Sequence, residues 1–105
     1  MVNKISPEEL QQRLNNREKV VLLDVREPWE YEIAHLPSAI LISLDTLSKN
    51  FEKLSKSDEI IVYCHTGARS QYACILLRRA GFDSVKNLAG GIDAWSDIDS
   101  TVQKY

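Results

Sequence analysis

The chain has 105 residues, of which 44% are hydrophobic and 27% charged, and its formal net charge is −2. This composition predicts one globular domain, residues 1–105, large enough to bury a hydrophobic core without disulfide bonds or structural metals. Charges of both signs are interspersed, which argues against nucleic acid as a partner. No apolar run approaches the ~18 residues of a membrane span, and the N-terminus does not have the pattern of a signal peptide. We therefore expect a cytoplasmic protein with no membrane partner.

Helical and extended patterns alternate along the chain. Ser6 followed by Pro7 marks the first helix start, and Asp24 alone breaks an apolar run that is typical of a buried strand. The predicted elements, in chain order, are a helix from 7 to 14, a strand over 20–25, a short helix or turn over 28–34, a strand over 39–42, a helix over 44–54, a strand over 60–63, a helix over 68–80, a strand over 85–88 and a helix over 92–95. This alternation predicts an α/β fold with a mostly parallel sheet.

The most informative segment is the predicted strand over 60–63, which runs directly into Cys64. In parallel sheets, ligands bind outside the carboxyl ends of the strands. Gly67 permits a tight turn, and the predicted helix begins at Ala68. The backbone amides of residues 65–69 can therefore curve around the sulfur of Cys64. A thiol at a helix start is biased toward thiolate. The alternative is a buried structural cysteine, but this arrangement favours nucleophilic catalysis by Cys64.

Residues 64–70, Cys-His-Thr-Gly-Ala-Arg-Ser, resemble the active-site loop of rhodanese-like sulfurtransferases, whose pattern is C-x-x-G-x-R-[S/T]. Three further segments are similar to motifs of this family: residues 23–31 to D-V-R-x-x-x-E-[YF], residues 33–39 to G-H-I-x-G-A with Ala34 and Ser38 in place of glycines, and residues 88–95 to L-x-G-G-x-x-x-W. The ending, residues 98–105, is similar to the tail of rhodanese domains fused to adenylyltransferases of sulfur-carrier systems.

The resemblance implies a three-layer rhodanese-like fold with about five short strands flanked by helices. It implies a sulfurtransferase that moves sulfane sulfur from a donor, such as thiosulfate or a persulfide, through a persulfide on Cys64. The acceptor would be a thiol, cyanide or a sulfur-carrier protein. The implied substrate-binding residues are His65, Thr66, Gly67, Ala68 and Arg69, and the implied supporting residues are Asp24, Arg26, Glu30 and Ser70. We expect no cofactor, no metal and a monomer.

The roles of the charged residues stay open. A cation in a first helical turn opposes the helix dipole, so Arg69 either orients donor anions or pairs with a carboxylate such as Asp24 or Glu30. Arg26 either binds donor or, as we expect, pairs with Glu30. His65 either tunes the thiolate or is a solvated loop residue, which is the preferred interpretation. Asp24 is expected to fix the turn that follows it.

Two other functions compete with sulfur transfer. A cysteine phosphatase or arsenate reductase uses C-x-x-x-x-x-R, one residue longer than the spacing from Cys64 to Arg69, because a tetrahedral oxyanion needs a wider cradle. A non-catalytic interaction module is the second alternative, and the presence of Cys64 argues against it. Cys74 could act as a resolving thiol, but its position inside a helix favours a core cysteine.

Overall fold

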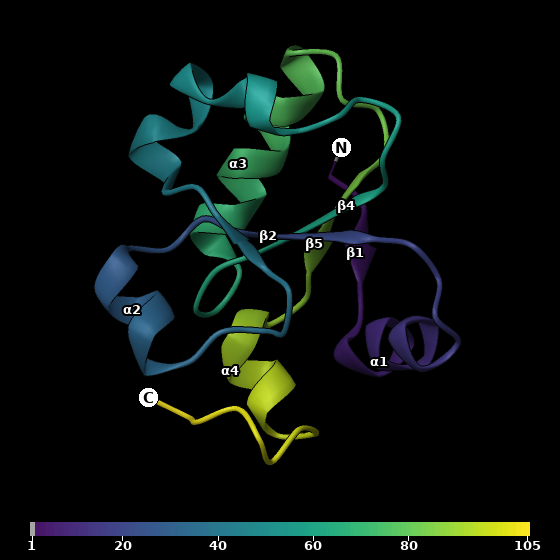
Figure 1. Ribbon diagram of the computed structural model, residues 1–105, viewed down its shortest axis with the longest axis vertical. Coiled ribbons are helices and arrows are strands. Elements are labelled where there is room, and N and C mark those ends of the chain that lie inside the picture. The colour runs from purple at the N-terminus through teal and green to yellow at the C-terminus, as the bar shows by residue number, and fades with distance from the viewer. Residues whose placement is uncertain (1) are drawn as a thin grey trace.

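A sheet of five short strands forms the middle layer of the computed structural model, which describes residues 2–105 (Figure 1). The strands are β1 (Lys4–Ile5), β2 (Val21–Asp24), β3 (Ile40–Leu41), β4 (Ile60–Tyr63) and β5 (Val85–Leu88). Their spatial order is β1-β5-β4-β2-β3, and every pairing is parallel. The predicted α/β class is confirmed, and β1 is a two-residue strand that the apolar pattern did not indicate.

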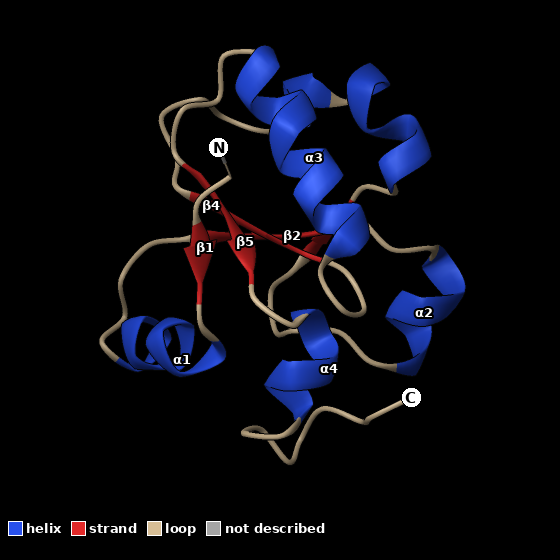
Figure 2. Cartoon of the chain, turned by 180° about the vertical axis from the view of Figure 1, so that it is seen from behind, coloured by secondary structure: helices blue, strands red, loops and turns tan. Residues whose placement is uncertain are grey.

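Helices cover both faces of the sheet, as Figure 2 shows. They are α1 (Pro7–Asn15), α2 (Pro28–Ile33), α3 (Ala68–Arg79) and α4 (Gly91–Ser96), with two 3-10 helices, η1 (Leu44–Lys49) and η2 (Phe51–Lys53). One core lies between the sheet and the layer of α3 and η1, and a second core lies between the sheet and the layer of α1 and α4. The predicted three-layer arrangement is therefore confirmed.

The central strand β4 determines where the candidate site lies. All four of its residues are buried, which explains their uniformly apolar character. The parallel register pairs Tyr63 of β4 with Asp24 of β2, so both strands end at the same edge of the sheet. Cys64 follows β4 directly and therefore lies in the middle of the carboxyl edge, where ligands of parallel sheets bind.

The single helix predicted over residues 44–54 is wrong, because the structure has η1 and η2 there. The break lies at Asn50, whose backbone is not helical, with φ −131° and ψ 20°. The Asn50 side chain donates to the Thr46 carbonyl at 2.8 Å. Asparagine offers the backbone such local bonds in competition with a regular helix, which accounts for the interruption.

The turn before β3 explains one departure from the family pattern. Ser38 has φ +65°, a left-handed conformation that glycine adopts freely and that costs other residues about 1–2 kcal/mol. Ala34, by contrast, has an extended backbone with φ −164°, which any residue adopts. Only the serine is therefore strained, and the strain lies in the turn before β3 and not in the Cys64 loop. Within residues 2–105, the helices are all too short or too polar to cross a membrane.

Candidate functional site

The sulfur of Cys64 accepts hydrogen bonds from two backbone amides of the loop that follows it. Gly67 N–H donates to Sγ at 3.1 Å and Ser70 N–H at 3.4 Å. Gly67 lies within the predicted span 65–69, and Ser70 is one residue beyond it. Gly67 has φ +117°, and this backbone angle turns the chain into the first turn of α3. The sulfur therefore faces two backbone N–H groups at the start of α3.

Asn87, from β5, positions the hydroxyl of Ser70 beneath the same sulfur. Its Nδ2–H donates to the Gly67 carbonyl at 3.1 Å, which turns its Oδ1 toward the Ser70 hydroxyl, 2.5 Å away. Ser70 Oγ lies 3.3 Å from Cys64 Sγ. The Ser70 hydroxyl also lies 3.2 Å from the Gly67 carbonyl oxygen, so Asn87 Oδ1 and Gly67 O are both within reach of its one proton. Asn87 is not among the residues predicted for the site, although a polar residue within a buried strand is a signal of such a role.

Helix α4 supports the loop from the other side. Ile92 N–H donates to the Cys64 carbonyl at 2.9 Å, and Asp93 N–H donates to the His65 carbonyl at 3.0 Å. Gly91 makes this approach possible, since a Cβ there would lie 2.4 Å from the His65 oxygen. Gly91 therefore serves a steric purpose, because its lack of a Cβ lets the start of α4 contact the backbone of the loop.

Arg69 binds Glu30 through two hydrogen bonds. Nη1–H donates to Oε1 at 2.7 Å and Nη2–H donates to Oε2 at 2.9 Å. This bidentate pair lowers the pKa of Glu30 to about 2, with further hydrogen bonds from Glu27 and Tyr105 acting in the same direction against burial. Of the two roles left open for Arg69, the structure shows pairing with a carboxylate.

Arg26 pairs with Asp24, so the expected pair with Glu30 is wrong. Its Nε and Nη2 donate to the two Asp24 carboxylate oxygens at 2.9 and 2.7 Å, and both side chains are fully buried. Asp24 also accepts from the Arg26 backbone N–H at 3.0 Å and so fixes the following turn, as expected. Glu30 is out of reach because it occupies the third position of α2, where its side chain caps Glu27 N–H and faces Arg69.

Tyr105 joins these two ion pairs and covers His65. Its hydroxyl accepts from Arg26 Nη1–H at 2.7 Å and donates to Glu30 Oε2 at 2.8 Å. Its ring stacks on the His65 ring with centroids 4.3 Å apart, and the Tyr105 carbonyl accepts from His65 Nε2–H at 3.1 Å. His65 is therefore packed, and the interpretation as a solvated loop histidine is wrong. In both views the chain end lies beside α2 (Figures 1 and 2).

Comparison with known proteins identifies the family. Residues 6–98 match the family described as "Rhodanese-like domain". The chain belongs to the rhodanese-like domain family. This rhodanese-like domain is 38% identical over 96 residues to a sulfurtransferase of Allochromatium vinosum, covering 91% of this chain and 90% of that protein. It is 37% identical to the putative sulfur carrier protein YrkF of Bacillus subtilis over 90% of this chain, and it spans only 51% of YrkF. The crystal structure of a rhodanese-like domain protein from Staphylococcus aureus superposes with a TM-score of 0.89 at 29% identity, covering 99% of each chain.

The remaining residues of interest in this rhodanese-like domain lie on either side of the loop. Thr66 and Ala68 are exposed on its outer face, while Cys64 is 1% exposed at its base. Cys74, inside α3, is fully buried in the core, and burial raises the pKa of its thiol to about 12. Among residues 2–105, no group of three or more His, Cys, Asp or Glu side chains is arranged to hold a metal ion.

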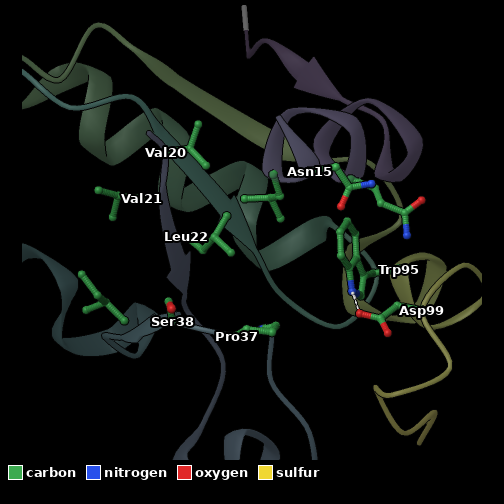
Figure 3. A pocket seen from close by; sticks show the side chains of 11 residues that line it. Asn15, Val20, Val21, Leu22, Pro37, Ser38, Trp95 and Asp99 are labelled. Atoms are coloured by element: carbon green, nitrogen blue, oxygen red, sulfur yellow. Dashed lines mark hydrogen bonds between the residues drawn. The ribbon is translucent and has the colours of Figure 1, made fainter. Parts of the chain in front are cut away.

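A separate cavity of about 570 Å³ opens between α1, β2 and the turn before β3 (Figure 3). Its walls are mainly apolar, with Asn15 and Asp99 at one side, where Trp95 Nε1–H donates to Asp99 at 3.0 Å. The residues that line it lie outside the segment from Cys64 to Ser70. The cavity of this rhodanese-like domain is therefore distinct from the cysteine loop.

Proposed function

We propose that this chain is a sulfurtransferase that moves a sulfane sulfur from a donor, such as thiosulfate or a persulfide, to a thiophilic acceptor through a persulfide on Cys64. The observation that carries the proposal is the Cys64 sulfur itself, which accepts backbone N–H bonds from Gly67 and Ser70 at the start of α3. The sulfurtransferase of Allochromatium vinosum, whose length this chain covers to 90%, supports the same reaction class.

In the first half-reaction, the Cys64 thiolate attacks the outer sulfur of the donor. A new S–S bond forms at Cys64, and the bond between the donor's two sulfur atoms breaks, with the electron pair leaving on the donor fragment. The two fixed N–H donors stabilise the thiolate before attack and the anionic persulfide after it. Because Cys64 is 1% exposed, only a small terminal atom reaches it, which suits the outer sulfur of a sulfane donor.

In the second half-reaction, an acceptor nucleophile attacks the outer sulfur of the persulfide and restores the Cys64 thiolate. A thiol, cyanide or a sulfur-carrier protein can take this role. The similarity to YrkF, whose name describes a putative sulfur carrier, supports a carrier protein as one acceptor class. Splitting the transfer into two displacements replaces one difficult step with two easier ones.

The loop residues have distinct roles in this proposal. Gly67 supplies the turn and a donor, and the exposed Thr66 and Ala68 meet donor and acceptor at the outer face. Arg69 binds Glu30 and so connects the first turn of α3 to α2. Ser70, Asp24 and Arg26 act as supporting residues, the first beneath the sulfur and the other two beside Tyr105.

The orientation of Arg69 argues against a phosphatase. In a phosphate cradle the arginine must contact the oxygens of the bound tetrahedral group, whereas here both terminal nitrogens of Arg69 are occupied by Glu30. Only four residues separate Cys64 from Arg69, which leaves a narrow loop. Measurable turnover of an aryl phosphate would contradict this argument.

Mass spectrometry of the intact protein after exposure to a sulfane donor tests the proposal. We expect the wild type to gain the mass of one sulfur atom, and Cys64→Ser to gain nothing. Cys74→Ser is the matched control, since it removes the other cysteine and should still be loaded. If the wild type stays unmodified by thiosulfate, thiosulfonate and persulfide donors, the proposal is wrong and a non-catalytic module becomes the better description.

A further inference from the structure

The segment 99–105, which follows α4, is bound to the rest of the domain along its length (Figure 1). Val102 is buried in the core between the sheet and the layer of α1 and α4. Lys104 Nζ–H donates to the Asp93 carbonyl at 3.1 Å, and the ammonium pairs with the Asp93 carboxylate at 3.2 Å. These contacts lead the segment past α4 toward α2 and place Tyr105 beside the cysteine loop.

Tyr105 contacts the residue that directly follows the cysteine. Its ring stacks on the His65 ring, with centroids 4.3 Å apart and an angle of 17° between the two planes. His65 Nε2–H donates to the main-chain oxygen of Tyr105 at 3.1 Å. A ring held by stacking on one face and by a hydrogen bond at its edge can turn only by giving up both contacts. Tyr105 therefore holds the chain immediately after Cys64.

Tyr105 also contacts the ion pair at the far end of the same loop. Its hydroxyl donates to Glu30 Oε2 at 2.8 Å, and Glu30 in turn binds Arg69. Arg26 Nη1–H donates to the same hydroxyl at 2.7 Å, so the phenol is both donor and acceptor. Burial raises the pKa of Tyr105, so the phenol keeps the proton that it donates. Because Arg69 directly precedes Ser70, this contact holds the chain beside the second N–H donor to the sulfur.

The two contacts bracket the turn that presents N–H groups to the sulfur. His65 and Arg69 lie on either side of Gly67, whose N–H donates to the sulfur at 3.1 Å. Asn87 and the start of α4 bind backbone carbonyls of the loop, whereas Tyr105 holds side chains at both of its ends. Hydrogen-bond donors assist a reaction only when they are already oriented toward the reacting atom, so a loop held at both ends is preorganised.

Resting on the proposed function, we propose that Tyr105 is a positioning residue for sulfur transfer. By contacting His65 and the Glu30–Arg69 pair at once, it fixes the turn whose N–H groups point at Cys64. Its role is indirect, because it acts through the loop and not on the reacting sulfur. Loss of Tyr105 should therefore slow the transfer of sulfur more than it weakens the binding of the donor.

Leucine and phenylalanine at this position separate the two contacts. Tyr105→Leu removes both the stacked ring and the hydroxyl, whereas Tyr105→Phe keeps the ring on His65 and loses only the hydroxyl. Loading of sulfur is followed by mass spectrometry over a range of thiosulfonate concentrations. We expect the limiting rate constant to fall about tenfold in Tyr105→Leu and about threefold in Tyr105→Phe. The donor concentration that gives half the limiting rate should stay within about twofold of the wild-type value in both.

Tyr31→Leu is the matched control. Tyr31 stacks on His35 with centroids 3.8 Å apart, a similar tyrosine–histidine pair that lies outside the cysteine loop. Its loss should leave the limiting rate constant unchanged, even where the free energy of unfolding falls as far as in Tyr105→Leu. All rates are compared at a temperature at which circular dichroism shows each variant to be folded. Equal limiting rate constants in Tyr105→Leu and Tyr31→Leu would overturn the inference.

Amide hydrogen exchange tests the geometry of the loop without any sulfur donor. The exchange of Gly67 and Ser70 N–H reports their bonds to the sulfur, and Val62 N–H, in β4, reports unfolding of the whole domain. Relative to Val62, we expect both loop amides to exchange about tenfold faster in Tyr105→Leu than in the wild type. Unchanged relative exchange would overturn the inference. A wild type that no donor loads would overturn the proposed function, and exchange would still decide whether Tyr105 holds the loop.

Discussion

Replacing Gly91 with alanine should damage both the stability of the domain and the cysteine loop. A Cβ at this position would lie 2.4 Å from the His65 carbonyl oxygen and 2.6 Å from the Cys64 carbonyl oxygen. Both contacts are with backbone atoms, which cannot swing aside as a flexible side chain does. The loop and the start of α4 must therefore separate, and the two backbone hydrogen bonds that join them must lengthen or break.

The magnitude follows from two effects. The backbone at Gly91 has φ +61°, and placing a Cβ on such a left-handed residue costs about 1–2 kcal/mol. Each lost backbone hydrogen bond adds about 0.5–1.5 kcal/mol. We expect the free energy of unfolding to fall by about 2–5 kcal/mol in Gly91→Ala, out of the roughly 5–15 kcal/mol typical of a native domain.

Gly81→Ala is the matched control. Gly81 also has a positive φ, +98°, but the nearest atom to its added Cβ is the flexible Lys56 Nζ at 3.1 Å. Only the backbone strain should remain there, about 1–2 kcal/mol. Urea unfolding followed by circular dichroism measures both variants, and sulfur loading is then compared where both are folded. Equal losses of unfolding free energy and equal loading would refute the steric argument for Gly91.

The remaining predictions concern the ion pairs and the second cysteine. Arg26→Met leaves the buried Asp24 carboxylate without its partner, and the free energy of unfolding should fall by about 3–5 kcal/mol in urea titrations; a fall below 1 kcal/mol would contradict this. Because the pKa of Glu30 is lowered to about 2 by Arg69, its pairing stabilises the fold above about pH 5, and this contribution is lost as the pH falls toward 2. The difference in free energy of unfolding between wild type and Glu30→Gln should therefore shrink by about 2 kcal/mol between pH 6 and about pH 2, a value reduced because Arg69 is partly exposed to solvent. A difference that does not change with pH would show that the ion pair contributes nothing to stability. Cys74→Ala should keep the wild-type rate of sulfur loading, because the thiol is buried and its pKa is raised to about 12; a large drop in rate would instead make it a resolving thiol.

The strand, loop and helix around Cys64 could be predicted from the sequence because their signals are local. A four-residue buried strand, a glycine at the turn and a helical pattern lie within twenty consecutive residues. The residues expected at the site also come close in the structure, since Asp24 and Tyr63 are paired across neighbouring strands. Parallel strands that end at one edge bring their following residues together without further information.

The partners of the charged residues could not be predicted, because they depend on contacts far apart in the chain. Spacing alone does not say which carboxylate a guanidinium meets, and Arg69 reaches Glu30, a residue 39 positions away. Tyr105 meets Glu30 across 75 positions, and Asn87 meets Ser70 across 17. Such pairs are decided by how α2, β5 and the chain end pack, which a pattern of apolar residues does not encode.

The support of the loop by later elements has a consequence for biosynthesis. Asn87, the start of α4 and Tyr105 all follow Cys64 in the chain, so they leave the ribosome after it. Until they emerge, the Gly67 carbonyl lacks its amide donor and the loop carbonyls lack the N–H groups of α4. The loop around Cys64 therefore gains its full set of supporting hydrogen bonds only when synthesis of the domain is nearly finished.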